Sequence, residues 1–268
     1  MLLVIGEALI ELEGGASFEQ SAFKPRPGGA ALLEAVSAAE AGAKVRFLTR
    51  VGRDAAGAWI KATLAESGLE AQIQEDHQHP TSLALTGPDT LFYRAADAQL
   101  DAPGEVFFEG GTTLHATAWP FGLDPARTHA VQAFREGIRR GLALSLDLNY
   151  HPRAFKGDLL EIIRPFMPFS YLKVDEPAAR SLGFRPSELF TLAGTVLFFR
   201  EERVQLLSLM DESDAPLPPN VPTEAIYGRF LAAIDGGAEP AEALSAALEA
   251  FQQKKGKGRG KKSQKTKG

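Results

Sequence analysis

Hydrophobic and polar positions along the chain switch between strand-like and helix-like patterns. Short apolar runs that end in glycine or polar residues predict buried strands at residues 2–5, 44–51, 142–149, 171–174, 194–199 and 204–209. Amphipathic spacing predicts helices at residues 30–41, 54–66, 127–140, 223–234 and 241–252. Because strands and helices alternate, the pattern indicates an α/β fold with a mostly parallel central sheet, continued antiparallel by the strand at residues 204–209.

A separate hairpin is predicted between two of these helices. Residues 81–85 and 90–93 have strand-like sequences, and the turn residues Gly87, Pro88 and Asp89 separate them. We expect this hairpin to form an appended β lid.

Composition excludes several kinds of chemistry. The chain has 268 residues, 44% of them hydrophobic, and no cysteine, so disulfides, thiolate catalysis and cysteine-based zinc sites are excluded. His77 and His79 lie close together without a third ligand nearby, and we expect solvated loop residues and no metal site. The first apolar run lacks the basic flank of a secretory signal and no segment is long enough to span a membrane, so we expect a cytoplasmic protein that does not bind membranes.

The end of the chain carries a charge opposite to that of the rest. Eight Lys and Arg residues follow residue 252 with no acidic residue among them, whereas 21 basic and 34 acidic residues precede them, a net charge of about −13. Glycine, lysine and serine without apolar periodicity predict that residues 252–268 are a disordered, basic tail. Such a tail is either a solvated extension or a binding segment for an anionic partner such as RNA, DNA or a ribosome.

Two polar residues stand where an α/β sheet usually binds ligands. Asp147 and Asn149 end the strand LALSLDLN, and ligands bind at the carboxyl ends of parallel strands. The alternative is that both side chains only cap the turn after the strand.

Four segments resemble the PfkB branch of the ribokinase superfamily, in particular 2-keto-3-deoxygluconate kinases and fructokinases. The segments are VIGEALIELE, RPGGAALLEAVSAAEAGAKVRFLTRVGRDAAGAWIKATLAESGLE, LFYRAADAQL and LSLDLNYHPRAF, in the family's order. The resemblance covers residues 1 to about 251. It implies a ribokinase-like three-layer α/β/α domain over residues 1–251, with a small β lid from residues 12–27 and 72–96 that mediates a homodimer in many relatives.

The resemblance also implies a reaction and its cofactors. The family transfers a phosphoryl group from ATP, with Mg²⁺, to a hydroxyl group of a sugar or sugar acid, using an aspartate as the base and a GAGD turn as the anion hole. Carried over by position, it implies substrate contacts at Glu11, Gly28, Gly29, Tyr93, Arg94 and His151, nucleotide contacts at Asn149, Val221 and Thr223, and the base at Glu224.

Several family positions carry other residues in this chain. Leu33 replaces a sugar-binding asparagine, His151 replaces an arginine that grips a carboxylate, and Ala178 replaces the glutamate of the magnesium motif that begins at Asp175. Arg200 and Arg203 stand at the two positions where the family has glycines beside the nucleotide. We expect both arginines at a charged hairpin tip.

The anion hole itself is changed throughout. The GAGD turn reads Val221, Pro222, Thr223 and Glu224, and proline has no N–H group to donate to a phosphate.

Three of the retained residues have a second interpretation. Glu224 is either a displaced base or a first-turn glutamate that complements the helix dipole. Glu11 is a ligand contact or a solvated residue, and Arg94 a ligand contact or part of a surface ion pair.

Three interpretations of the whole chain follow. The first is a degenerate sugar kinase, a pseudoenzyme that keeps the fold and binds a ligand or partner. The second is an active but divergent sugar or sugar-acid kinase that uses Glu224 as its base. The third is a scaffold or nucleic-acid-associated protein that acts through residues 252–268.

Overall fold

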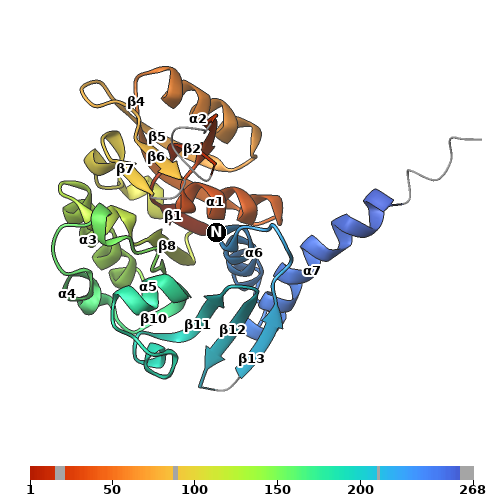
Figure 1. The fold of residues 1–268 in the computed structure, drawn as a ribbon. Coiled ribbons are helices and arrows are strands. Elements are labelled where there is room, and N and C mark those ends of the chain that lie inside the picture. The colour runs from red at the N-terminus through yellow and green to blue at the C-terminus, as the bar shows by residue number, and fades with distance from the viewer. Residues whose placement is uncertain (16–21, 87–89, 210–211, 260–268) are drawn as a thin grey trace, which may run out of the picture.

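A large sheet of nine strands forms the centre of the molecule (Figure 1). The structure, a computed structural model, describes residues 1–15, 22–86, 90–209 and 212–259. The strand order is β13-β12-β11-β10-β9-β8-β1-β4-β5, parallel from β5 to β11 and antiparallel at β12. The strands are β1 (Leu2–Ile5), β4 (Val45–Gly52), β5 (Glu70–Asp76), β8 (Thr113–Thr117), β9 (Ala143–Asp147), β10 (Phe169–Asp175), β11 (Ala193–Arg200), β12 (Arg203–Ser208) and β13 (Glu212–Pro216).

Helices cover both faces of this sheet, each over its own hydrophobic core. One face packs against α1 (Ala30–Glu40), α2 (Ala55–Glu66), α6 (Thr223–Asp235) and α7 (Pro240–Arg259). The other face packs against α3 (Ala126–Arg139), α4 (Leu159–Ile163) and α5 (Glu176–Ser181). The predicted three-layer α/β/α fold with a mostly parallel sheet is therefore confirmed.

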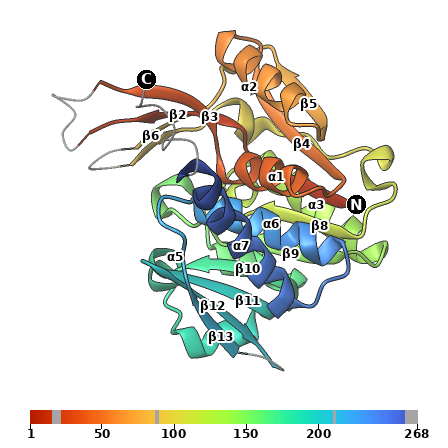
Figure 2. The ribbon, with the colours of Figure 1, turned by 90° about the vertical axis from the view of Figure 1, so that its right-hand side faces the viewer.

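A second, small sheet extends from one side of the main body (Figure 2). Its order is β3 (Lys24–Gly28), β2 (Leu9–Glu13), β6 (Leu83–Thr86) and β7 (Leu91–Tyr93). Strands β6 and β7 pair antiparallel, which confirms the predicted hairpin, and the turn residues 87–89 lie outside the described residues. The predicted lid segment 72–96 begins too early, because residues 72–76 belong to β5, which pairs in parallel with β4 in the large sheet.

One central strand was not predicted from the sequence. β8 lies between β1 and β9, and all five of its residues are buried. Its sequence, TLHAT, alternates polar and apolar residues but has only two apolar positions, so no apolar run marks it as a buried strand. Two of its polar side chains, His115 and Thr117, are buried with hydrogen-bond partners, as the site below shows.

The final helix continues further than predicted. α7 runs to Arg259, so the predicted disorder does not hold for the backbone of residues 253–259, and the rest of the basic tail lies outside the described residues. Gln and Lys are good helix formers, so a helix already packed on the body can continue through them. None of the described helices is both long and apolar enough to cross a membrane. A partner for the tail and a homodimer through the small sheet stay predictions.

Helices α1 and α6 cross closely because a glycine lies at their contact. A Cβ atom on Gly228 in α6 would lie 2.3 Å from the carbonyl oxygen of Glu34 in α1. No real Cβ approaches backbone so closely, so any side chain here would push the two helices apart.

We expect Gly228→Ala to lower the free energy of unfolding by about 1–3 kcal/mol, because overpacking forces the backbones to shift. Urea unfolding followed by circular dichroism measures this. Gly104→Ala is the matched control, since that glycine has an ordinary extended backbone and no atom within 4 Å of an added Cβ. The control should change stability by less than about 1 kcal/mol. Equal effects of the two variants would show that the close crossing does not constrain the fold.

Candidate ligand pocket

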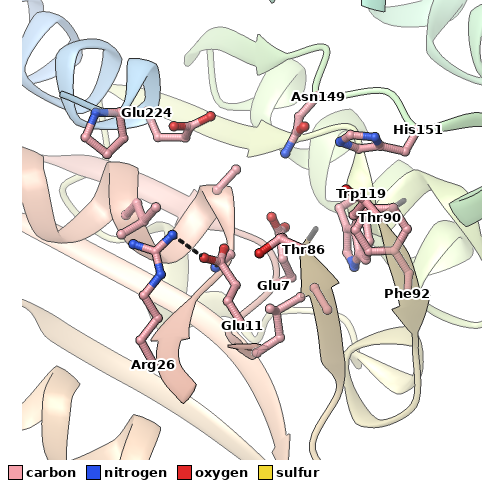
Figure 3. A pocket seen from close by; sticks show the side chains of 16 residues that line it. Glu7, Glu11, Arg26, Thr86, Thr90, Phe92, Trp119, Asn149, His151 and Glu224 are labelled. Atoms are coloured by element: carbon pink, nitrogen blue, oxygen red, sulfur yellow. Dashed lines mark hydrogen bonds and ion pairs between the residues drawn. The ribbon is translucent and has the colours of Figure 1, made fainter. Parts of the chain in front are cut away.

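A pocket of about 270 Å³ lies between the small sheet and the carboxyl ends of the central strands (Figure 3). This is close to the lower end of the range for small-molecule sites. Its lining combines apolar, aromatic and polar side chains with three carboxyl groups. The lining residues are Glu7, Leu9, Glu11, Arg26, Gly29, Ala30, Leu33, Ala84, Thr86, Thr90, Phe92, Trp119, Asn149, His151, Pro222 and Glu224.

Glu7 reaches the pocket from the end of β1. Its carboxylate accepts hydrogen bonds from the backbone N–H of Ala31 (3.3 Å) and from the hydroxyl of Thr117 in β8 (2.7 Å). Only 3% of the residue is exposed. Burial raises the pKa of Glu7 to about 7, although both hydrogen bonds oppose the rise, and the nearby charge of Asp97 adds to it.

Glu11 on β2 lies in front of the N-terminus of α1. It accepts a hydrogen bond from the backbone N–H of Gly29 (3.1 Å) and forms an ion pair with Arg26 on β3 (2.6 Å). A Cβ atom on Gly28 would lie 2.5 Å from the Glu11 carboxyl carbon, and Gly29 has a φ of 101°. The Gly-Gly pair thus gives Glu11 room and lets the backbone turn into α1.

Phe92, Trp119 and His151 form an aromatic wall opposite Glu11. The ring centroid of Phe92 lies 4.9 Å from that of Trp119 and 5.0 Å from that of His151. Burial lowers the pKa of His151, so its imidazole is neutral near pH 7.

Two residues outside the pocket lining, Asp97 and Arg94, hold the Trp119 indole in place. Its N–H donates to Asp97 (2.6 Å), which also accepts from Arg94 (2.8 Å). The Arg94 guanidinium lies over the indole ring, 4.4 Å from its centroid. Arg94 therefore supports the wall of the pocket.

Glu224, in the first turn of α6, shares a buried ammonium group with Asp147. Lys173 on β10 donates to Asp147 at 2.8 Å and to Glu224 at 3.3 Å, and the side chains of Lys173 and Asp147 are each 1% exposed. Burial opposes ionisation of Glu224, but the Lys173 ammonium and hydrogen bonds outweigh it, so the Glu224 pKa lies below its ordinary value. Burial raises the pKa of Asp147. The Lys173 ammonium opposes that rise, and Glu224 lies nearer to solvent, with 23% of its side chain exposed.

A chain of buried polar groups continues from this triad between α1, β8, β9 and α6. Glu34 contacts His115 (2.7 Å), His115 contacts Ser145 (2.9 Å), and Ser145 contacts the hydroxyl of Tyr227 (2.9 Å). Burial raises the pKa of Glu34 to about 8 and lowers that of His115 to about 4. Both groups are consequently uncharged near neutral pH, and the Glu34 carboxyl donates to His115.

The structure brings together half of the residues predicted to form the site. Glu11, Gly29, Asn149, His151 and Glu224 all line the pocket. The other five do not line it: Gly28, Tyr93, Arg94, Val221 and Thr223.

Gly28 and Arg94 make the contacts described above, and the other three side chains also lie outside the pocket lining. The Tyr93 side chain is exposed, Val221 packs against the core under α6, and the Thr223 hydroxyl donates to Glu224 (3.3 Å). Their ligand contacts, and those of the lining residues, stay predictions.

Sequence reasoning missed several residues of the site, among them Glu7, Phe92, Trp119 and Lys173. A signal existed for Glu7, which follows a buried strand and a glycine at the edge where α/β sheets bind ligands. Asp147 was expected to bind a ligand or cap a turn, but it pairs with Lys173, which no local pattern indicates.

The residues present do not fit Mg²⁺ and ATP as the family would bind them. Asp175 caps α5 by accepting from the Ala178 N–H (2.7 Å), and Ala178 has no carboxylate. Among the described residues, no group of three or more His, Cys, Asp or Glu side chains could hold a metal ion.

Two further positions where the resemblance implies nucleotide contacts also differ from the family. Pro222 precedes α6 without an N–H group, and its own carbonyl accepts the N–H groups of Ala225 and Ile226. At the predicted hairpin tip, which β11 and β12 form, Arg203 is bonded to Asp214 (2.9 Å), and Glu176, Glu201 and Glu202 line the neighbouring hollow.

The fold, the small sheet and the pocket below it define a ribokinase-like sugar kinase architecture. The sequence profile of the pfkB family carbohydrate kinases matches residues 1–155, more than half of the chain. The chain belongs to this family.

Curated relatives match a little more than half of the chain. It is 25% identical over 160 residues to the ATP-dependent 6-phosphofructokinase of Thermoanaerobacterium thermosaccharolyticum, covering 56% of this chain and 50% of that one. It is 28% identical over 155 residues to a fructokinase of Escherichia coli, covering 54% and 50%. The chain thus spans about half the length of the curated relatives it matches.

Solved structures share the fold over nearly the whole chain. Halothermothrix orenii fructokinase superposes with a TM-score of 0.79 at 22% identity, over 92% of this chain and 96% of that one. A sugar kinase of Pyrococcus horikoshii solved in complex with ATP has a TM-score of 0.80 at 17% identity, over 92% and 90%. Identities this low support the fold alone.

We expect Lys173→Met to destabilise the protein by about 3–5 kcal/mol, because it leaves two carboxyl groups near the core without their cation. Chemical denaturation measures the loss. Adding Asp147→Asn should recover part of it. Arg203→Met, which breaks an exposed pair with Asp214, should cost about 1 kcal/mol or less. If Lys173→Met lowered the free energy of unfolding no more than this control, the sharing of the Lys173 ammonium group by Asp147 and Glu224 would be contradicted.

Glu34 should make stability fall as the pH rises. Its pKa is about 8 in the folded protein and about 4.5 when unfolded, so its contribution is complete below about pH 4.5 and is lost as the pH rises through about 8. Unfolding free energies of the wild type and Glu34→Gln, compared at about pH 5 and about pH 8.5, test this. The wild type should lose stability relative to the variant. Glu40→Gln, on the exposed side of α1, should show no such difference.

Proposed function

We propose that this chain is a ligand-binding pseudokinase of the pfkB family, which keeps the sugar pocket and has lost phosphoryl transfer. The observation that carries the proposal is the start of α6. There Pro222 offers no N–H group, and the only carboxylate, Glu224, is bound to Lys173. A transferring phosphoryl group needs preorganised backbone donors, and these are absent at Pro222.

The lining of the pocket supports a sugar-like ligand. Aromatic faces of Phe92 and Trp119 suit the apolar C–H side of a sugar ring, and Asn149, Thr90 and Glu11 can exchange hydrogen bonds with hydroxyl groups. The similarity to a fructokinase and a 6-phosphofructokinase supports a monosaccharide as the class of ligand. A cytoplasmic location belongs to the same proposal.

The loss of transfer follows from several changes that act on the same step. The anion hole lacks a donor at Pro222, and the magnesium motif lacks its glutamate at Ala178. Three glutamates and two arginines line the hollow beside the hairpin tip, where the resemblance places two glycines. Each change weakens binding or stabilisation of a triphosphate, because a donor or a magnesium ligand is lost or a large side chain replaces a glycine.

One observation favours a second candidate, an active divergent kinase. The Glu224 carboxylate lines the pocket, and its lowered pKa keeps it ionised, as a general base requires. This candidate predicts ATP-dependent chemistry that depends on Glu224.

The purified chain, incubated with ATP, Mg²⁺ and a panel of sugars and sugar acids, distinguishes the two candidates. We expect a rise in melting temperature with at least one monosaccharide, no shift with ATP or ADP, and no ADP release above the rate without protein. Glu224→Gln should likewise release no ADP above that rate. ADP release that disappears in Glu224→Gln would establish the active kinase in place of the pseudokinase.

A further inference from the structure

The pocket is strongly biased towards negative charge. Of the described residues that line it, three have carboxyl groups, Glu7, Glu11 and Glu224, and Arg26 alone has a permanent positive charge. Figure 3 shows the three carboxyl groups directed towards a common space, with Asn149 opposite Glu7 and Glu11.

The positive charges near the pocket already have partners. Arg26 forms its ion pair with Glu11 at 2.6 Å, and half of its side chain is exposed to solvent. Lys173 does not line the pocket and is held behind Glu224 by two carboxyl groups. His151 is neutral near pH 7 because burial lowers its pKa. An anionic ligand would therefore find no unengaged cation among the lining residues.

The helix N-termini that face the pocket are partly occupied by the protein's own carboxylates. Such ends normally bind phosphates and carboxylates through free N–H groups. At α1 the N–H groups of Gly29 and Ala31 donate to Glu11 and Glu7. At α6 the capping residue is Pro222, and Glu224 occupies the first turn. The protein's own carboxylates thus take the places where a sugar acid or sugar phosphate would bind.

Glu7 is the carboxyl group without a cation. Its carboxyl group accepts hydrogen bonds from the hydroxyl of Thr117 on β8 and from the N–H of Ala31 on α1, both neutral. Glu11 is compensated by Arg26, and Glu224 by Lys173. A cationic group on the ligand beside Glu7 would complete the charge balance of the pocket.

We infer, building on the proposed function, that the ligand is a monosaccharide-sized polyol with a protonated amino group, that Glu7 is its counter-ion, and that sugar acids and sugar phosphates are excluded. The hydroxyl groups of such an amino sugar would meet Asn149, Thr90 and the aromatic wall, and its ammonium group would meet Glu7. The pocket volume of about 270 Å³ limits the ligand to small molecules of this kind.

Ionisation of Glu7 couples this binding to pH. The pKa of Glu7 is about 7 without ligand, and an ammonium group favours the ionised form. The groups that face Glu7 are Thr117 and His115 from β8, Asp97 from the 3₁₀ helix η1 (Ala96–Gln99), and Glu34 from α1, with Glu11 and Glu224 across the pocket. Affinity for an amino sugar should rise as the pH increases through about 7, whereas affinity for a neutral sugar should not.

A matched series tests the charge preference. Glucose, 6-amino-6-deoxyglucose, glucuronate and glucose 6-phosphate differ only at carbon 6, and glucosamine places the amine elsewhere on the ring. Calorimetric titration of the full chain at about pH 6 and about pH 8 should show at least one amine binding roughly tenfold more tightly than glucose at the higher pH. The ratio should fall at the lower pH. The acid and the phosphate should not bind.

Two variants connect the preference to the residues. Glu7→Gln keeps an oxygen that accepts from Thr117 and removes the charge, so the advantage of the amine and its pH dependence should both disappear. Glu13→Gln, an exposed carboxylate of β2 outside the pocket lining, is the matched control. Leu33→Arg adds a cation to the lining and should allow glucuronate to bind, which tests the inference even if Glu7→Gln fails to fold.

The outcomes separate this inference from the proposed function. Glucose binding as well as both amines, or tight binding of glucuronate to the wild type, would overturn the inference and leave the pseudokinase proposal intact. ADP release from ATP with any of these sugars would overturn the pseudokinase proposal and leave the charge preference standing. Absence of binding by all five compounds would overturn both.

Discussion

The buried ammonium group of Lys173 is the interaction on which the site depends. It joins β10 to Asp147 on β9 and to Glu224 at the start of α6, so it fixes where α6 begins relative to the sheet. A charge this deeply buried is tolerated only with partners of opposite charge, and its two partners are therefore not free for other roles. Glu224 is thereby bound to Lys173 in the first turn of α6.

Charged side chains in the rest of the pocket are also bound to groups of the protein itself. Glu7 and Glu11 use the free N–H groups at the start of α1, and Arg26 compensates Glu11. Behind them Glu34 and His115 remain uncharged because both are buried, and they satisfy each other by a hydrogen bond. The protein's own carboxylates thus accept hydrogen bonds at the start of α1, and this arrangement is the basis of the ligand preference proposed above.

The sequence predicted most elements of the fold but only part of the site. Strands such as Leu2–Ile5 and helices such as Ala55–Glu66, with its cap at Asp54, follow from local patterns because periodicity and capping are local properties. β8 escaped prediction because its Thr and His side chains are buried through bonds to Glu7 and Glu34, residues more than 80 positions away. Arg94 was linked to a ligand by its position in a motif, whereas contacts with Asp97 and Trp119 direct it to the wall of the pocket.

The sequence by itself determined the α/β fold, the family resemblance, and the absence of N–H donors at Pro222, because each depends on residue identity and short-range spacing. Only the tertiary structure decided which carboxyl groups are compensated. Lys173, Asp147 and Glu224 come from three separate segments, and their meeting depends on how the strands are ordered and where α6 is packed. Coulomb interactions and burial act through space, so the charge of the pocket became visible only when the chain was folded.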